Sequence, residues 1–279
     1  MPHSGPTDLV LFAKMRAPRR VPRPMSMLTA LMLATLLAGP VQPGAAQPSL
    51  GAGSEATLFQ NVRIFDGKSS TLSAASSVLV RGNRIERIST SPIAADAGTR
   101  VIDGGGRTLM PGLIDAHWHA MLIALSPAET LAGDIGYSNL VAAAEAKDTL
   151  LRGFTTVRDV GGPAFGLKRA IDEGVMVGPR IYPSGAFISQ TSGHGDFRFV
   201  FEVPRTLGEP LGHSEVEGIA DSLDEVRLRT REQLRNGASQ IKLMAGGGVA
   251  SPYNPIESTQ YTEPEIRAAV ELRIIEIPM

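Results

Sequence analysis

Two histidines separated by a single residue are the part of the sequence with the clearest chemical potential. His117 and His119 end the run 111–119, which reads PGLIDAHWH. In a β-strand, residues two apart project from the same face, so both imidazoles should point the same way while Trp118 points to the other side. Two imidazoles at this spacing can bind one divalent metal ion. On the spacing alone, two exposed or core histidines without a metal remain an alternative.

A lysine within an apolar segment is the second candidate. Lys242 lies in the run 240–245, which reads QIKLMA. Burial of an ammonium group is costly, so desolvation lowers the pKa and favours the neutral amine. A neutral amine can add carbon dioxide and become a carbamate, an anion with two oxygens that can bridge two metals. A lysine at a strand end with its ammonium group in solvent is the alternative at this point.

Three further polar residues lie where an active site would be expected. His194 lies in the glycine-flanked run 191–196, TSGHGD, and we interpret it as a contact to substrate or as a loop histidine without a role. Asp115 shares a strand face with His117 and could fix the tautomer of a histidine. Asp159 ends the next expected strand. For both aspartates a structural role is an equal alternative.

The elements that must position these residues change in character near residue 110. Residues 55–107 alternate between apolar and polar positions around turns such as Gly82-Asn83, which predicts a small antiparallel sheet. After Pro111, expected strands alternate with expected helices. The strands are 113–119, 155–159, 180–189 and 240–245; the helices are 139–152, 164–173, 222–236 and one starting at Thr262, with a capping box to Glu265.

This alternation predicts an α/β fold, with parallel strands joined by helices. We expect an incomplete (β/α)8 TIM-type barrel, about the first four strands, over residues 111–279. A small β-sandwich-like domain is expected over 47–110. A complete barrel commonly takes about 250 residues, more than the sequence offers after Pro111. We therefore expect a C-terminally truncated chain.

The first residues have the pattern of a secretory signal peptide, assigned to 1–46. Arginines 16, 19, 20 and 23 precede an apolar run from Met27 to Ala38, which Pro40 and Gly44 interrupt. The run is shorter than the roughly 18 residues of a membrane span, although an uncleaved anchor is an alternative. The expected location is periplasmic or secreted, with no stable membrane span after cleavage.

Composition excludes several classes of function. The 279-residue chain has a formal net charge of −1 and no basic cluster beyond the leading stretch, which argues against binding to nucleic acid. The chain has no cysteine, so disulfides, thiolate metal sites and a thiol nucleophile are excluded. Any metal must be bound by His, Asp, Glu or a modified side chain.

Together, these segments resemble the amidohydrolase superfamily, and more narrowly its imidazolonepropionase-like and Xaa-Pro dipeptidase-like branch. The run 111–119 is the most specific part of the resemblance. It is supported by the runs 153–159 (GFTTVRD), 191–196 (TSGHGD) and 241–248 (IKLMAGGG). The resemblance implies two divalent metal ions, usually zinc, with His117 and His119 as ligands and a carboxylated Lys242 as the bridge.

The resemblance also implies hydrolysis of an amide or related C–N bond, with a metal-activated water as nucleophile. In the family, the general base is an aspartate after the last barrel strand, and two more histidine ligands come from strands five and six. The sequence has neither histidine nor aspartate after Lys242. No catalytic residue is therefore assigned.

The expected substrates are dipeptides or N-acyl amino acids, with cyclic amides as the alternative. We expect the truncated chain itself to be inactive. Two other classes remain open: a non-catalytic fragment and a metal-independent binding module. Beyond a small-molecule or dipeptide substrate, the sequence implies no partner, and an oligomer is compatible with it.

Overall fold

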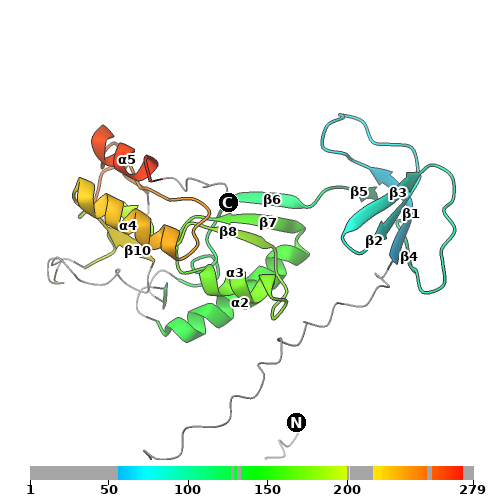
Figure 1. The fold of residues 1–279 in the computed structure, drawn as a ribbon, viewed down its shortest axis with the longest axis horizontal. Coiled ribbons are helices and arrows are strands. Elements are labelled where there is room, and N and C mark those ends of the chain that lie inside the picture. Colours follow the sequence, from blue (N-terminus) through cyan, green and yellow to red (C-terminus); the bar gives the residue numbers. More distant parts are fainter. Residues whose placement is uncertain are drawn as a thin grey trace, which may run out of the picture. The chain divides into compact units, whose positions relative to one another are not determined.

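The computed structural model of the chain places the described residues in one compact unit, Glu55–Met279 (Figure 1). The described residues are 56–126, 129–130, 133–199, 201, 216–249 and 253–272. The expected signal peptide, 1–46, lies outside them. Within the described part, no helix is both long enough and apolar enough to span a membrane.

The N-terminal part of this unit is a sheet of five strands in the order β3-β2-β1-β4, with β5 paired to β1. The strands are β1 (Ala56–Ile64), β2 (Ser76–Arg81), β3 (Arg84–Ser89), β4 (Arg100–Asp103) and β5 (Thr108–Leu109). The β2–β3 hairpin turns at Gly82 and Asn83 as expected, and Gly82 takes a positive φ of 58°.

The expectation of a purely antiparallel sheet is wrong. β1 pairs antiparallel with β2 but parallel with both β4 and β5. The physical reason is the connection after β3: it is long enough to cross to the far side of β1 and enter β4 in the same direction as β1. Two-residue turns force antiparallel neighbours, and longer connections do not.

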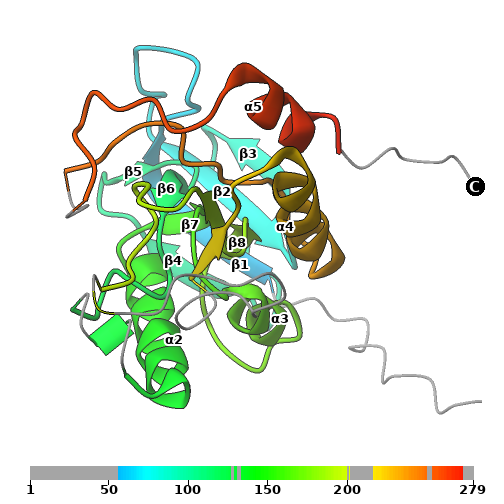
Figure 2. The same cartoon turned by 90° about the vertical axis from the view of Figure 1, so that its left-hand side faces the viewer.

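After β5, parallel strands alternate with helices, as the sequence predicts. β6 (Leu113–Trp118), β7 (Phe154–Asp159) and β8 (Arg180–Pro183) form a parallel three-stranded sheet in chain order. α2 (Ile135–Leu151) connects β6 to β7, and α3 (Phe165–Asp172) connects β7 to β8. Both helices lie side by side along this sheet (Figures 1 and 2).

The core of this layer forms where the helices meet the sheet. Its buried apolar residues come from β6, α2, β7, α3 and β8, and they include Trp118, Ala142, Ala146, Val157, Leu167 and Ile181. The small alanines of α2 allow that helix to approach the strands closely. Burial of these side chains, at roughly 25 cal/mol per Å² of apolar surface, favours the arrangement.

The expected third strand, 180–189, is divided in two. β8 ends at Pro183, and β9 (Phe187–Ser189) begins after a bend at residues 184–186. Gly185 has a φ of 71°, and a Cβ there would lie 2.2 Å from Oε1 of Gln233, so the bend depends on glycine. β9 pairs parallel with β10 (Glu217–Ile219), a short strand that the sequence analysis did not predict.

The expected fourth strand, 240–245, is also shorter than predicted. Its regular pairing is a single parallel bridge between Leu243 and Ile188. The Ile188 N–H donates to the Lys242 carbonyl at 2.9 Å, and the Met244 N–H donates to the Ile188 carbonyl at 2.9 Å. Beyond it, Gly246 forms an isolated antiparallel bridge with Thr259. The described strands do not close a barrel, so the α/β class holds while closure is not observed.

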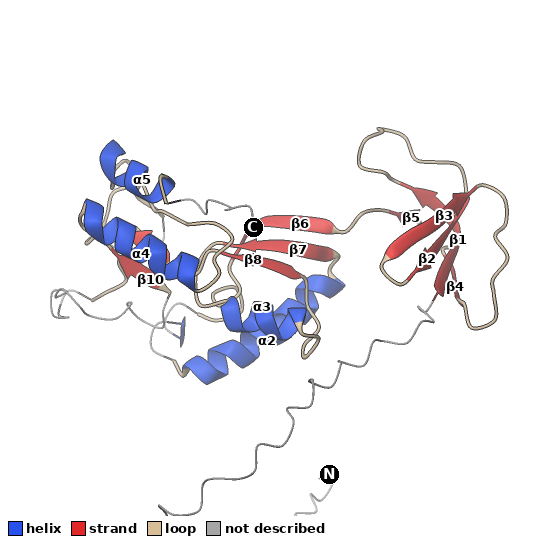
Figure 3. Cartoon of the chain, viewed as in Figure 1, coloured by secondary structure: helices blue, strands red, loops and turns tan. Residues whose placement is uncertain are grey.

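Two helices flank this second group of strands. α4 (Leu223–Arg235) begins after Ser222, whose side chain accepts from the Glu225 N–H. α5 (Glu263–Val270) begins with the predicted capping box, in which the Thr262 N–H and hydroxyl both donate to the Glu265 carboxylate. The two helices contact each other. Figure 3 shows them among the other elements, with helices in blue and strands in red.

Candidate metal centre

The end of β6 brings the paired histidines together. The rings of His117 and His119 have centroids 5.2 Å apart and planes tilted by 60°. Between them, Trp118 points into the core and is only 2% exposed. The alternation predicted from the sequence is therefore the arrangement in the structure. Burial of the tryptophan fixes the face from which both imidazoles project.

His119 lies in an environment that favours the neutral ring. Burial lowers its pKa to about 4, and the positive charges of His117 and Lys242 contribute in the same direction. Its Nδ1 is buried and has no well-aligned hydrogen-bond partner among the described residues. Metals bind the neutral form of histidine, so this environment holds the ring in the form that a metal requires.

Asp115 and Asp159 both serve the backbone in this region. Asp115 Oδ1 accepts the His117 N–H at 2.9 Å, so it fixes the main chain and not a ring tautomer. Asp159 is fully buried; its Oδ2 accepts the Ala120 N–H at 2.7 Å and its Oδ1 accepts the Gly161 N–H at 3.3 Å. Burial raises the pKa of Asp159 to about 7, against the effect of these two donors.

Lys242 is close enough to both His119 and His194 for its charge to lower their pKa values. The pKa of Lys242 is itself lowered, first by burial and then by the positive charge of Arg158. The direction agrees with the expectation of an amine shifted towards its neutral form. Lys242 is partly buried, and burial is the largest cause of the lowered pKa of its ammonium group.

Arg158 is a member of this region that sequence reasoning did not identify. Its Nε donates to the Ala116 carbonyl at 2.7 Å, which ties β7 to β6 beside the histidines. A charged residue between the buried Val157 and Asp159 was the available signal, because alternation along β7 places it on the opposite face.

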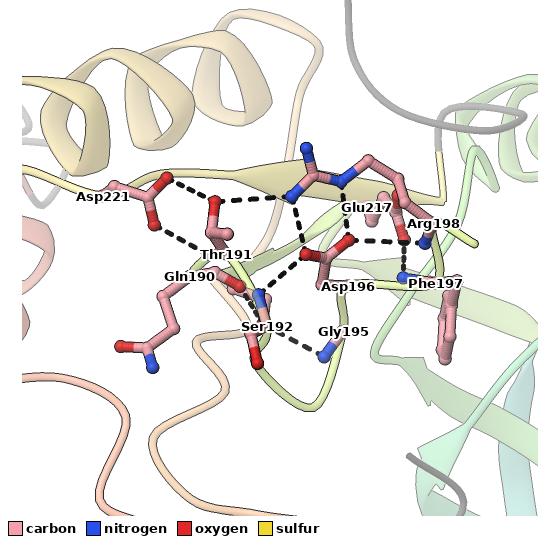
Figure 4. Close-up of polar contacts among 10 residues, drawn as sticks. Gln190, Thr191, Ser192, Gly195, Asp196, Phe197, Arg198, Glu217 and Asp221 are labelled. Carbon is pink, nitrogen blue, oxygen red and sulfur yellow. Dashed lines mark hydrogen bonds and ion pairs between the residues drawn. The ribbon is translucent and has the colours of Figure 1, made fainter. Parts of the chain in front are cut away.

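The loop that carries His194 is held by a network of polar contacts (Figure 4). Asp221 accepts the Thr191 N–H and hydroxyl, both at 2.6 Å. Asp196 forms a two-point ion pair with Arg198 at 2.7 and 2.6 Å, and it also accepts the Ser192 N–H at 2.7 Å. These contacts lie on both sides of His194 along the chain.

The electrostatics of this loop differ from those around His119. Burial opposes ionisation of Asp196, yet its pKa lies below the ordinary value because Arg198 and the Ser192 N–H donate to it. Burial lowers the pKa of His194, and the charge of Lys242 adds to this effect. His194, whose pKa is lowered, therefore lies in a loop that is held by charged and polar contacts.

The donor set fits a metal site that is only partly formed by histidine. Among residues that the structure describes, no three His, Asp or Glu side chains are arranged to bind a metal. The β6 end provides the His117–His119 pair, with Lys242 nearby, and the buried Nδ1 of His119 has no well-aligned hydrogen-bond partner among the described residues. Neutral imidazole nitrogen is a common ligand of divalent metal ions.

The chain is similar in sequence and in fold to several known hydrolases. The chain is 35% identical over 189 residues to an ochratoxinase of Aspergillus niger, covering 58% of this chain and 36% of that protein. A solved prolidase in complex with N-methylphosphonate-L-proline has a TM-score of 0.71 and 36% identity, covering 77% of this chain and 53% of its own. A solved Xaa-Pro dipeptidase with bound methionine has a TM-score of 0.67 and 30% identity, covering 78% and 53%.

The chain spans about half of the length of these solved structures and about a third of the ochratoxinase. The sequence profile of the amidohydrolase family matches residues 108–274, which is more than half of the chain and includes His117, His119, His194 and Lys242. By its sequence and its fold, the chain belongs to the amidohydrolase family.

Proposed function

We propose that the protein, in its full-length form, is a metal-dependent hydrolase of amide or peptide C–N bonds that acts on dipeptides or N-acyl amino acids. The observation that carries the proposal is the pair of imidazoles, 5.2 Å apart at the end of β6, with Lys242 beside them. The similarity to a prolidase, a Xaa-Pro dipeptidase and an ochratoxinase supports hydrolysis and this class of substrate.

Two divalent ions, with zinc as the expected metal, would be held by His117, His119 and the carbamate of Lys242. A metal pair of this kind lowers the pKa of a bound water and polarises the scissile carbonyl. The residues of the chain prepare the site for it. The pKa of His119 is lowered to about 4 by burial, so its ring is neutral at pH 7 and needs no proton removed.

His194 would bind the substrate from the opposite loop. Burial and the positive charge of Lys242 both lower the pKa of His194 and favour the neutral ring. In a neutral imidazole, one ring nitrogen carries a hydrogen that it can donate. A carbonyl or carboxylate oxygen of the substrate is the acceptor that this donor would suit. We assign no general base among the described residues, because neither Asp115 nor Asp159 has a carboxylate free of backbone contacts.

The proposal is tested with zinc-loaded protein, both as the 279-residue chain and as a version extended to the length of its relatives. Xaa-Pro dipeptides, N-acyl amino acids and cyclic amides are offered in parallel, and release of product is measured. Hydrolysis of the first two classes, lost on His117→Ala, supports the proposal. Turnover of cyclic amides alone would favour the alternative substrate class.

Two other outcomes separate the remaining classes of function. If ligands bind equally well with and without metal, and His117→Ala leaves binding unchanged, the protein is a binding module. If the 279-residue chain retains no zinc after gel filtration while the extended version does, the chain acts as a non-catalytic fragment. The expectation that the 279-residue chain is inactive stays a prediction until this measurement.

We also propose that the protein is exported to the periplasm or secreted. The support is the pattern of residues 1–46 alone, a basic stretch followed by a short apolar run. Expression in a bacterial host, followed by cell fractionation and N-terminal sequencing, would test it. A new N-terminus near Gln47 in the periplasmic fraction is the expected result, and full-length protein retained in the cytoplasm would contradict it.

A further inference from the structure

Gln260 joins two segments of the candidate site that are far apart in sequence. It is buried, with 4% of its surface exposed. Its side-chain Oε1 accepts the His194 N–H at 3.0 Å, and its own N–H donates to the Ala245 carbonyl at 3.1 Å. Ala245 follows Lys242 by three residues. A single buried amide residue therefore contacts both the loop of His194 and the segment of Lys242.

The segment of Gln260 is itself aligned against the chain that leaves Lys242. Gly246 and Thr259 form an antiparallel bridge, and the Gly247 N–H donates to the Ser258 carbonyl at 3.1 Å. This pairing sets the register of Gln260 relative to Lys242. The side chain of Gln260 then connects this paired segment to the main chain of His194.

The ring of His194 is seated by packing. A Cβ at Gly248 would lie 2.0 Å from the His194 ring, so the glycine backbone is in close contact with it. The Gly248 N–H donates to Asn254 Oδ1 at 3.1 Å, which holds that backbone in place. His194 Nδ1 is buried and has no hydrogen-bond partner within the described ranges. The main chain of His194 and the wall beside its ring therefore determine where the imidazole lies.

We propose that Gln260 is a positioning residue, which holds His194 at a fixed place relative to Lys242 through its carbonyl oxygen, with the Gly248 backbone as the wall for the ring. The inference deepens the proposed function, since it concerns the residue assigned to bind substrate. Asp196 and Asp221 fix the loop of His194 from its own side, as Figure 4 shows. Gln260 provides the link to the Lys242 side.

The test compares Gln260→Leu, which keeps the volume and removes the acceptor, with Gln260→Glu, which keeps an acceptor oxygen. Hydrogen exchange at the His194 amide and the 1H–13C signal of the His194 ring are measured by NMR in the full chain. We expect Gln260→Leu to speed exchange at His194 by about tenfold, as for loss of one hydrogen bond, and to shift the ring signal. Gln260→Glu should restore both.

Gln233 offers a matched control, because its buried side chain also accepts a backbone N–H, that of Ala186 at 3.0 Å. Gln233→Leu should speed exchange at Ala186 and leave His194 unchanged. A second variant covers the case in which Gln260→Leu does not fold: Gly248→Ala should shift the His194 ring signal while the His194 amide stays protected.

Three results would overturn the proposal. The first is an unchanged His194 amide in Gln260→Leu. The second is failure of a folded Gln260→Glu variant to restore protection, which would show that the acceptor oxygen does not protect the His194 amide. The third is an unchanged ring signal in Gly248→Ala. These measurements use neither metal nor substrate, so absence of hydrolysis by the extended version would refute the proposed function without affecting this inference.

Discussion

Two buried aspartates, one on each side of the candidate site, have pKa values shifted in opposite directions. Asp159, the last residue of β7, accepts hydrogen bonds from two backbone N–H groups, and burial raises its pKa to about 7. Asp196, in the loop of His194, has the Arg198 guanidinium and the Ser192 N–H, and its pKa is lowered. The first carboxyl group has no cationic partner among the described residues, whereas the second has the guanidinium of Arg198 in its own loop.

The difference indicates how the two sides divide their roles. In the loop of His194, the protein itself supplies the guanidinium of Arg198, which offsets the charge of Asp196. The end of β6 is not balanced in this way: it gathers His117, His119 and Lys242, with a buried ring nitrogen left without a partner in the described part. Such a region is suited to a ligand that completes it, as the proposed metal would.

The largest effect should follow from loss of the β6 ligands. The double variant His117→Ala, His119→Ala is expected to weaken zinc binding by more than about 100-fold, since loss even of an outer partner of a ligand costs about 10- to 100-fold. Zinc affinity by competition with a chromophoric chelator is the measurement. His194→Ala is the control and should leave the affinity within a few-fold. An equal loss of zinc affinity in His194→Ala and in the double variant would contradict the proposed difference between the two sides of the site.

Neutralising Asp196, which is paired with Arg198, should lower the free energy of unfolding at neutral pH. Asp196→Asn removes the partner of Arg198, a pair whose side chains are 7% and 19% exposed. We expect a loss of about 2 kcal/mol, below the 3–5 kcal/mol of a fully buried pair, because the arginine reaches solvent. Urea unfolding at pH 7 measures it.

The pH dependence of that loss gives a sharper check. The folded pKa of Asp196 is lowered, so its contribution is present above the unfolded value of about 3.9 and is lost as pH falls through the folded pKa. The difference between the two proteins should therefore shrink below about pH 4. A difference that is constant from pH 7 to pH 3 would point to packing instead of charge.

Asp159 should show the opposite sign. Its folded pKa of about 7 lies above the unfolded value of about 3.9, so the folded chain retains a proton that the unfolded chain has lost between these values. Stability should fall as pH rises from about 4 to 7, by at most about 1.4 kcal/mol for each pH unit. Unfolding of the metal-free chain across this range measures it. Asp159→Asn should remove this slope, and a variant with an unchanged slope would place the titrating group elsewhere.

The smallest effect is expected for an ion pair on the surface. Lys168 and Asp172 lie one helical turn apart on α3, with side chains 31% and 48% exposed. Asp172→Asn should cost no more than about 0.5 kcal/mol, because solvent screens such pairs. The same urea titration serves as a baseline for Asp196. A loss comparable to that of Asp196→Asn would mean that burial does not distinguish the two pairs.

The sequence was sufficient for those parts that depend on local periodicity. The i, i+2 spacing placed His117 and His119 on one face, and the Thr262–Glu265 pattern placed the start of α5. In both cases the signal and the structure involve residues within a few positions of each other, where strand alternation and capping geometry apply directly.

Features that depend on distant contacts were missed. The parallel pairing of β1 with β4, the bend at Gly185 and the strand β10 all require knowledge of which segments meet. Gln260 gave no local signal, because its partners His194 and Ala245 come from other segments. Family resemblance pointed to the proposed ligands His117, His119 and Lys242, but it did not point to the residues around them, such as Gln260.

The bend at residues 184–186 connects the β6-β7-β8 sheet to the β10-β9 sheet, and its length affects the pairing of the second sheet. It lets one run of chain pair with β7 before the bend and with β10 and the Lys242 segment after it. Side chains alternate along a strand, so adding or removing one residue in the bend would invert the faces of β9 relative to β8. The side chain of Ile188 would then point to the opposite face of β9, and the pairing of Ile188 with Leu243 would shift. The pairing of β6 with β7 would stay the same. The number of residues in the bend therefore determines which face of β9 lies on the same side as a given face of β8.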